Sequence, residues 1–305
     1  MRLGYMFSGQ GAQFPGMGRD LYEGSSAAKA VFESADEVLH RSISRLCFDG
    51  TPEELTACAN CQPAIYTMSQ ACLAAFHERF PDVVPAVCGG LSLGELSALS
   101  AAGVFSFEDG LRLVAKRGEL MDVACRETHG GMAAVLGGDP SEIEAVCLEA
   151  GADVANLNCP GQIVISGEDG ALSKAVAALE GKVTRAVMLT VAGAYHSRLM
   201  DTASRQFGEV LAGVSMNAPA VPVVQNVTGD VVDDPGVLRR NLTLQVCSSV
   251  RWESCARAMM SRSDMLVEFG PGTVLCGFMK RIDRMYPSGS VGTLATLDAL
   301  ASKLA

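Results

Sequence analysis

The chain has 305 residues and a formal net charge of −10, and 49% of its residues are apolar but only 6% aromatic. This length suits one large domain with a smaller insertion, and the composition, rich in Gly and Ala, suits an α/β protein with close helix–sheet packing. The acidic balance argues against nucleic acid as a partner, and the apolar runs are too short to predict a membrane span.

The eleven cysteines are an odd number without framework spacing, and the chain begins directly with a predicted strand. Both features predict a cytoplasmic protein with free thiols. Cys58 and Cys61 form an isolated C-x-x-C with no second pair or nearby His to complete it. We therefore expect no metal site.

A strand predicted over residues 3–8 ends in a polar, glycine-rich loop that reaches Gln13. The loop is not a dinucleotide fingerprint, because Phe14 stands where the third glycine should be, and no Gly-Lys-Ser/Thr follows to make a phosphate loop. Ligands of open α/β sheets bind at the carboxyl ends of strands. The backbone N–H of Gln10 is therefore a candidate active-site donor.

Helices are predicted over the next part of the chain. One covers residues 25–39, and a capping box from Thr51 to Glu54 predicts that another begins there. Gln62-Pro63 is predicted to open a further helix, which continues to Phe80.

The next motif fits a nucleophile elbow. An apolar run over residues 83–88 predicts a buried strand, Gly90-Leu91-Ser92-Leu93-Gly94 fits the elbow pattern, and residues 95–102 predict a helix. Strand, sharp turn and helix are the context that the motif requires. Ser92 at the apex is the candidate nucleophile, and free N–H groups at the helix start could stabilise an oxyanion.

Arg117 lies in a helix predicted over residues 106–126. Its neighbours one turn away are all apolar: Leu113, Val114, Leu120 and Met121. These positions share one helix face, so Arg117 is predicted to face the core, where it needs an anionic partner. That partner is either a buried acid in a structural salt bridge or the carboxylate of a substrate.

A different pattern follows His129. Strands are predicted over 132–136, 154–158, 162–166 and 183–188, with helices over 140–150 and 169–179. This β-α-β-β-α-β order is the ferredoxin-like arrangement. We predict an α/β fold in which residues 124–191 form a ferredoxin-like small subdomain. It is inserted into a discontinuous, hydrolase-like large subdomain with a mainly parallel sheet, residues 1–123 and 192–305.

His196 follows the small subdomain and is predicted to begin a helix that runs to about Leu211. A helix N-terminus disfavours a cation and would help keep an imidazole neutral and able to act as a base. A surface histidine near a helix cap is the alternative interpretation. Further strands are predicted over 221–226 and 265–269, and helices over 274–282 and 297–304.

Taken together, the motifs resemble the malonyl-CoA:acyl-carrier-protein transacylase family, which includes the acyltransferase domains of polyketide synthases. The segments that carry the resemblance are the loop over residues 7–13, Gln62-Pro63-Ala64, the Ser92 elbow through Glu95, Arg117, Asn158-Cys159-Pro160-Gly161-Gln162, His196-Ser197, Asn226-Val227-Thr228-Gly229 and Gly270-Pro271-Gly272. Each is weak alone, but the ordered set is specific and covers nearly the whole chain.

The resemblance implies a ping-pong transfer of malonyl from malonyl-CoA to the phosphopantetheine thiol of an acyl carrier protein, without a cofactor. Ser92 would form the malonyl-enzyme and His196 would act as the base. The family orients this histidine with a main-chain carbonyl, which Gln245 matches. The backbone N–H groups of Gln10 and Leu93 would hold the oxyanion.

The resemblance also implies the substrate-binding residues: Arg117 for the malonyl carboxylate, with Gln62, Leu91, Met121, Asn158 and Tyr195. Leu91 stands where the family often has His, which puts the acyl-pocket shape and acyl-enzyme stability in doubt. Tyr195, just before the catalytic histidine, is compatible with malonyl and less so with branched malonyl groups.

The carrier protein is expected to be acidic, so this acidic chain needs local basic residues to dock it. The candidates are Lys182, Arg185, Arg198, Lys280 and Arg281. We expect no nucleic-acid or membrane partner, and a monomer.

Two other classes remain as alternatives. A serine hydrolase, either an esterase or a patatin-like lipase, shares the elbow, and Asp169-Gly170-Ala171 matches the patatin aspartate motif by spelling. A non-catalytic carrier-binding subunit would keep the fold, but intact Ser92, His196 and Arg117 argue against it. Fatty-acid and polyketide pathways both remain open.

Overall fold

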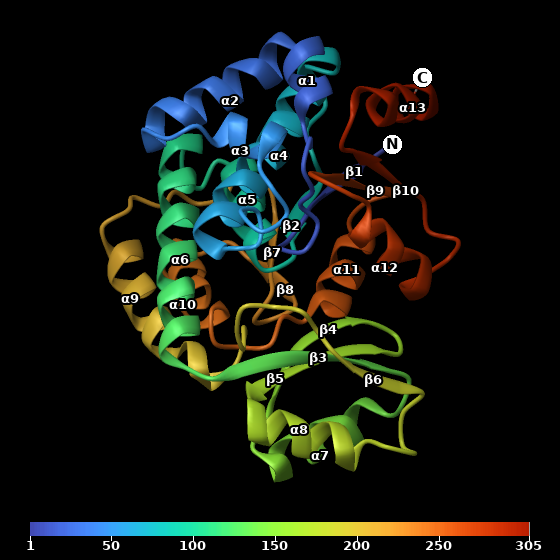
Figure 1. Cartoon of the computed structure of the whole chain (residues 1–305). Helices are drawn as coiled ribbons and strands as arrows, with labels where there is room; N and C mark the ends of the chain where they lie inside the picture. Colours follow the sequence, from blue (N-terminus) through green and yellow to red (C-terminus); the bar gives the residue numbers. More distant parts are fainter. Residues whose placement is uncertain (305) are drawn as a thin grey trace.

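The computed structural model describes residues 1–304, whose strands form a six-stranded and a four-stranded sheet (Figure 1). The larger sheet has the order β10-β9-β1-β2-β7-β8 and is parallel except for the β7–β8 pair. Its strands are β1 (Leu3–Phe7), β2 (Val87–Gly90), β7 (Val223–Gln225), β8 (Asp230–Val232), β9 (Met265–Phe269) and β10 (Ser288–Val291). The chain is therefore an α/β protein with a mixed sheet.

Helices cover both faces of the larger sheet. Tyr5 and Phe7 of β1 enter one apolar core, and Met6 enters another with Trp252 and Met259. Burial on both faces explains why β1 reads as a continuous apolar run. Helices of the first core are α1 (Arg19–Gly24), α2 (Ser26–Leu39), α3 (Ile43–Asp49), α4 (Cys58–Arg79), α5 (Leu93–Ala101), α6 (Phe107–Glu127), α9 (Asp201–Ala212), α10 (Pro235–Gln245) and α13 (Leu294–Leu304). Helices α11 (Trp252–Met260) and α12 (Val274–Ile282) belong to the second.

The smaller sheet is antiparallel and has the order β4-β5-β3-β6. Along the chain its elements are β3 (Gly130–Leu136), α7 (Pro140–Ala150), β4 (Asp153–Cys159), β5 (Gln162–Glu168), α8 (Asp169–Ala178) and β6 (Arg185–Met188). Helices α7 and α8 cover one face with their own apolar core, and the other face is turned toward the rest of the molecule (Figure 1). The predicted boundary at residue 124 falls inside α6, which continues to Glu127.

Backbone and side-chain contacts join the part of the chain that carries the larger sheet to the part that carries the smaller sheet. Val250, before α11, exchanges hydrogen bonds of 2.9 Å with Ala155 and Leu157 of β4. From α12, the Arg281 guanidinium donates to the Gln162 side chain at 2.8 Å and to the Pro160 carbonyl at 3.2 Å. These contacts join the edge strand β4 and the β4–β5 turn of the smaller sheet to the segments around α11 and α12.

The helix predicted to begin at Thr51 does not form, although its capping box does. Glu54 Oε2 accepts from the Thr51 N–H at 2.8 Å, and Thr51 Oγ1 accepts from the Glu54 N–H at 3.2 Å. The following residues make turns only, and the next helix, α4, begins at Cys58. A local capping pattern therefore closed one turn without the tertiary packing that would extend it.

Pro63 lies inside α4, not at its start as predicted. Proline has no N–H to donate to the carbonyl of Ala59, four residues earlier. That carbonyl instead accepts from the Arg41 guanidinium at 3.2 Å. The Asp122 carboxylate accepts from the N–H groups of Cys58 and Ala59 at 2.9 and 2.8 Å, so the helix start is capped from α6.

The strand predicted over residues 83–88 begins later, at Val87, and continues to Gly90. Pro85 cannot donate to a ladder, and the first N–H bonded to β1 is that of Ala86, which donates to the Leu3 carbonyl at 2.7 Å. The shift brings the strand directly up to the elbow. No helix among residues 1–304 is long and apolar enough to cross a membrane.

Candidate active site

Ser92 sits at a strained turn between β2 and α5. Its φ is 51° and its ψ −105°, a conformation that is costly for a residue with a side chain. A Cβ atom on Gly90 would lie 2.0 Å from the Gly94 backbone, and one on Gly94 would lie 2.1 Å from the Phe7 carbonyl oxygen. Both glycines are therefore required for strand and helix to approach closely enough to expose the serine.

His196 contacts Ser92 directly. Its Nε2 lies 2.8 Å from Ser92 Oγ, and its Nδ1 lies 2.9 Å from the main-chain oxygen of Gln245. A carbonyl can only accept, so Nδ1 carries the hydrogen and Nε2 is free to accept the serine proton. Burial and the nearby Arg117 charge lower the His196 pKa to about 4, so the imidazole is neutral at physiological pH.

The predicted cause of this neutral state is wrong. His196 does not begin a helix: a 3₁₀ turn covers Arg198–Met200, and α9 begins at Asp201. The helix dipole acts mainly within the first turn, so it contributes little here. His196 instead lies in a left-handed conformation with φ 58°, and desolvation is the main reason for its lowered pKa.

Arg117 points at the serine from α6 and is 1% exposed. Its Nη1 donates to Gln62 Oε1 at 2.9 Å, and its Nη2 donates to Ser92 Oγ and Gln245 Oε1, both at 3.1 Å. In the described part of the chain it forms no ion pair with an Asp or Glu, and its buried Nε has no partner. Burial lowers the Arg117 pKa to about 10, which leaves it charged at neutral pH. The structure thus favours the interpretation in which the anionic partner comes from outside.

Two backbone N–H groups next to Ser92 are free. The Ser92 N–H itself donates to Asn226 Oδ1 at 2.6 Å. The N–H groups of Leu93, at the start of α5, and of Gln10, after β1, have no acceptor among residues 1–304. The two segments touch, since a Cβ on Gly9 would lie 2.5 Å from the Leu91 carbonyl oxygen. Gln10 and Leu93 therefore each offer a free backbone donor on segments that touch beside Ser92, and free donors of this kind are what an oxyanion hole needs.

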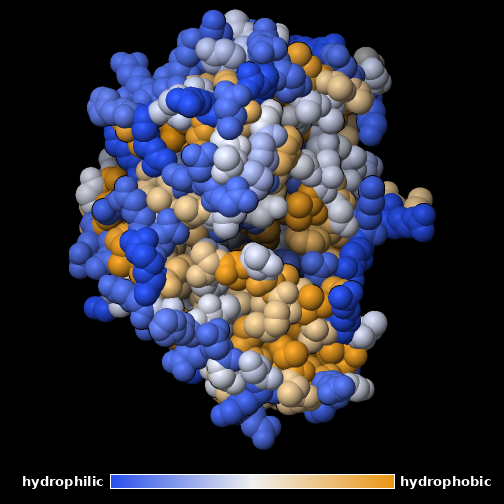
Figure 2. Space-filling model, in the orientation of Figure 1, coloured by the Kyte–Doolittle hydropathy of each residue, from blue (hydrophilic) through white to orange (hydrophobic). Residues whose placement is uncertain are grey.

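A cleft of about 410 Å³ opens between the two sheets above Ser92 and His196. Figure 2 shows a hollow at the centre of this face, with apolar residues gathered below it over the small sheet. The predicted residues that line the cleft are Gln10, Leu91, Met121, Asn158 and Tyr195. Gln62 contacts Arg117 beneath the cleft, and its Nε2 lies 3.3 Å from Met121 Sδ.

Polar groups of the small sheet also face this cleft. Asn156, Asn158 and Gln162 from β4 and β5 line it, and the buried Oδ1 of Asn158 has no partner within residues 1–304. Tyr195 lines the same cleft, and its hydroxyl accepts from Cys58 Sγ at 3.1 Å. The cleft therefore combines apolar walls with a few amide and hydroxyl groups, as ligand sites usually do.

The structure does not bring the five predicted docking residues together. Arg198 pairs with Asp153 at 2.7 Å, at the start of β4. Arg281 contacts the β4–β5 turn at the other end of that strand, and Arg185 lies at the same end because it pairs with Leu136 of β3. Lys182 precedes β6 and pairs with Glu142 at 3.1 Å. Arg198 thus lies at the opposite end of the small sheet from the other candidates. The Arg281 guanidinium already donates to Gln162 and Pro160, so it is engaged within the chain.

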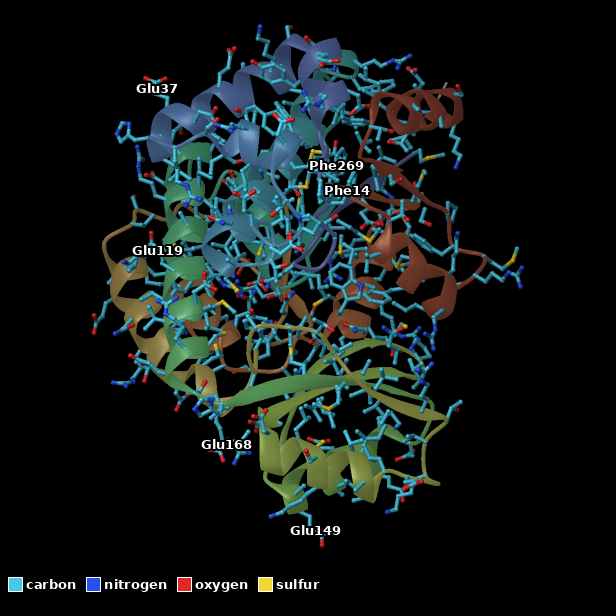
Figure 3. All side chains as sticks on the ribbon, in the orientation of Figure 1. Phe14, Glu37, Glu119, Glu149, Glu168 and Phe269 are labelled. Atoms are coloured by element: carbon cyan, nitrogen blue, oxygen red, sulfur yellow. The ribbon has the colours of Figure 1, made fainter. Side chains whose placement is uncertain are left out.

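The patatin-like aspartate lies away from the serine. Asp169 begins α8, directly after Glu168, the last residue of β5, which Figure 3 labels at one end of the small sheet. The Asp169 N–H contacts the His129 carbonyl oxygen at 3.3 Å. The fold therefore does not bring Ser92 and Asp169 together as a catalytic dyad.

Three side-chain contacts that hold the site residues in place were not predicted from the sequence. Asn226 holds the elbow through the Ser92 N–H, the Gln245 side chain holds Arg117, and Glu95 contacts both Asn226 and Gln245. Asn226 could have been found as a polar residue directly after an apolar strand. Glu95 could have been found as an acid in the first turn of a largely apolar helix.

Fold and site together define an α/β enzyme in which a half-buried serine contacts a buried histidine at the carboxyl edge of the sheet. The acyl transferase domain family matches residues 4–280. Over 304 residues the chain is 40% identical to the malonyl CoA-acyl carrier protein transacylase of Bacillus subtilis (strain 168), with 97% of this chain and 95% of that protein covered. The chain therefore belongs to the malonyl CoA-acyl carrier protein transacylase family of acyl transferases, as the motifs predicted.

Solved structures agree with this assignment. An acyl carrier protein S-malonyltransferase from Vibrio cholerae superposes with a TM-score of 0.93 at 36% identity, covering 98% of this chain and 100% of that one. A malonyl-transacylase solved in complex with a type II polyketide synthase acyl carrier protein has a TM-score of 0.95 at 33% identity, covering 99% and 100%. At 36% and 33% identity, the chain resembles these two proteins in sequence as well as in fold.

Proposed function

We propose that this acyltransferase moves the malonyl group of malonyl-CoA to the phosphopantetheine thiol of an acyl carrier protein, through a malonyl-Ser92 intermediate. The observation that carries the proposal is Arg117, a buried cation without an acidic partner in the described residues, 3.1 Å from Ser92 Oγ. Such a cation suits an acyl group that carries its own carboxylate. The names of the Bacillus relative and of the carrier-protein complex support the same substrate and partner.

In the first half-reaction, Ser92 Oγ attacks the thioester carbonyl carbon and its proton passes to His196 Nε2. The carbonyl oxygen becomes an oxyanion, which accepts from the N–H groups of Gln10 and Leu93. When the intermediate collapses, the C–S bond breaks and His196 returns the proton to the CoA sulfur. Free CoA leaves, and malonyl remains as an ester on Ser92.

In the second half-reaction, the pantetheine thiol of the carrier protein attacks the same ester carbonyl. Its proton passes to His196 and then to Ser92 Oγ as the C–O bond breaks. The Gln245 carbonyl oxygen, 2.9 Å from Nδ1, stabilises the imidazolium that forms in each half. No cofactor takes part in this scheme.

Arg117 binds the malonyl carboxylate and thereby aligns the thioester carbonyl with Ser92. Gln62 and Gln245 hold the guanidinium in place through their side-chain oxygens. Leu91 and Tyr195 line the cleft beside the acyl group, and Asn158 offers the pantetheine arm an amide oxygen that has no partner within residues 1–304.

The proposal includes the division of the chain into two subdomains. The β-α-β-β-α-β segment with strand order β4-β5-β3-β6 supports a ferredoxin-like small subdomain. The parallel strands around Ser92 support a hydrolase-like large subdomain, residues 1–123 and 192–305. We place 124–191 in the small one, with the last turn of α6 as the connection. The serine hydrolase alternative is less favoured, because His196 Nδ1 faces a carbonyl oxygen and not an acid.

Intact-mass spectrometry tests the proposed function. Brief mixing with malonyl-CoA is expected to add one malonyl group, and peptide mapping should place it on the peptide that contains Ser92. Adding a carrier protein with its pantetheine arm should then discharge the enzyme and add malonyl to the carrier. A labelled enzyme that loses malonyl to water equally fast with and without carrier would point to a hydrolase.

A docking surface formed by Arg185 and Lys280 gives a second expected outcome. Lys280 adjoins Arg281, which contacts the β4–β5 turn at the end of the small sheet where Arg185 lies. Arg185 and Lys280 are exposed, and their reversal to Glu should raise the Michaelis constant for the carrier protein without raising that for malonyl-CoA. The effect should fade as salt rises, because exposed charges are screened. Lys29→Glu, on α2, is the matched charge reversal and should change neither constant. Equal effects on both substrates would contradict this surface.

A further inference from the structure

Glu95 is a fully buried carboxylate three residues after Ser92 in the first turn of α5. Its Oε2 accepts from the Asn226 backbone N–H at 2.7 Å and from Gln245 Nε2 at 2.9 Å. Its Oε1 accepts from Gln225 Nε2 at 3.0 Å. The scheme proposed above gives Glu95 no part, although burying a carboxylate is costly unless its hydrogen bonds are met.

Gln245 connects Glu95 to the reacting groups. Its Nε2 donates to Glu95 and, at 3.0 Å, to the Ser92 carbonyl oxygen. Its Oε1 accepts from Arg117, and its main-chain oxygen accepts from His196 Nδ1. One residue therefore holds the cation and the base, and its side chain is held by the carboxylate.

The carboxylate decides which way the Gln245 amide is turned. An ionised carboxylate only accepts hydrogen bonds, so it requires the NH₂ end of the amide to face it. The amide oxygen then faces Arg117, which only donates. With the amide reversed, Arg117 would meet an NH₂ group and lose an acceptor inside a buried site.

We propose that Glu95 is a positioning residue for malonyl transfer, whose carboxylate acts through the Gln245 amide to hold Arg117 and His196 in line with Ser92. This inference rests on the proposed function and adds a residue to it. Asn226 extends the same arrangement, since its N–H binds Glu95 and its Oδ1 accepts from the Ser92 N–H.

The charge state of Glu95 gives this arrangement a pH dependence. The titratable groups that face Glu95 are the Arg117 guanidinium from α6 and the Cys255 thiol from α11. Burial raises the Glu95 pKa to about 7, against the opposing effect of its donors and Arg117. Protonated Glu95 would present an O–H to groups that all donate. The acylation rate should therefore fall as pH drops through 7, while His196, with its pKa near 4, is still neutral.

The test is Glu95→Gln, measured as the rate constant of malonyl-Ser92 formation per active site. We expect a fall of about 10- to 100-fold, on the scale of one or two charge-assisted hydrogen bonds. The fraction of enzyme that is finally malonylated should stay near one. We also expect the acid limb near pH 7 to disappear in this variant, because an amide does not titrate.

Glu268→Gln is the matched control. Glu268 is equally buried and accepts from the N–H groups of Leu275 and Cys276 at 3.1 and 2.8 Å and from Ser8 Oγ at 3.2 Å. Gln245 is not among its partners. Its variant should lose stability by a comparable amount but keep the acid limb of the pH profile.

A double-mutant cycle separates positioning from general damage. If Glu95 acts through Gln245, then Glu95→Gln combined with Gln245→Ala should cost no more than Gln245→Ala alone. Additive losses, or a wild-type rate constant in Glu95→Gln, would overturn the inference. Should Glu95→Gln not fold, a wild-type acylation rate constant in Gln245→Ala, which removes the amide through which Glu95 acts, would overturn it equally. Absence of a malonyl adduct on the wild type would instead defeat the proposed function.

Discussion

Replacing Ser92 with Ala is expected to abolish formation of the malonyl-enzyme while leaving the fold intact. The attacking oxygen is gone, and His196 has no hydroxyl to deprotonate at 2.8 Å. The strain at this position lies in the backbone, where φ is 51°, and alanine keeps the same Cβ. The measurement is intact mass after mixing with malonyl-CoA, with the melting temperature as the check on folding.

His196→Ala is the natural comparison for this variant. It keeps the nucleophile but loses the base, so acylation should slow by about 10²–10⁴-fold and still reach completion on Ser92. Transfer at near wild-type rate by Ser92→Ala would show that another group carries the acyl chain.

Arg117→Ala is expected to reverse the preference between malonyl and acetyl groups. Each charge-assisted hydrogen bond to the malonyl carboxylate contributes on the order of 1.5–3 kcal/mol. Losing two of them should lower malonyl-enzyme formation by roughly 100-fold or more. The acetyl group carries no carboxylate that needs a cationic partner in the cleft. Acetyl-enzyme should therefore form as fast as in the wild type or faster. The measurement is the ratio of the two acylation rates in wild type and variant.

Arg112→Ala, on the same helix, is the control for this experiment. Arg112 is exposed and pairs with Asp109 at 3.2 Å, so its loss should leave the malonyl-to-acetyl ratio unchanged. If Arg117→Ala lowers both rates equally, Arg117 is a structural residue and the carboxylate assignment fails.

Local patterns predicted much of this molecule. Helix α7, strand β9 and helix α12 have the bounds that capping residues and apolar runs indicated. Ser92 and Arg117 were singled out as candidates for the same reason, since a strand–turn–helix motif and an arginine on an apolar helix face are both visible within a few residues.

Features that depend on distant partners were not visible. Pro63 is tolerated inside α4 because Arg41 takes the free carbonyl of Ala59. The Gln245 side chain is placed by Glu95, 150 positions earlier in the chain. Strand β8 is short and antiparallel at a sheet edge, and its local pattern is weak. Such contacts arise from the assembled fold and leave no periodic signal.

The strand order has a consequence for how the polypeptide reaches this state during synthesis. Strand β1 lies between β2 and β9, yet β9 begins at Met265. At typical translation speeds, the ribosome needs on the order of ten to thirty seconds to proceed from the end of β2 to the end of β9. Until then, one hydrogen-bonding edge of a wholly apolar strand has no neighbour, which is the kind of edge that recruits other chains. Assembly of the catalytic edge, to which both β1 and β2 lead, thus waits until the residues of β9 have been made.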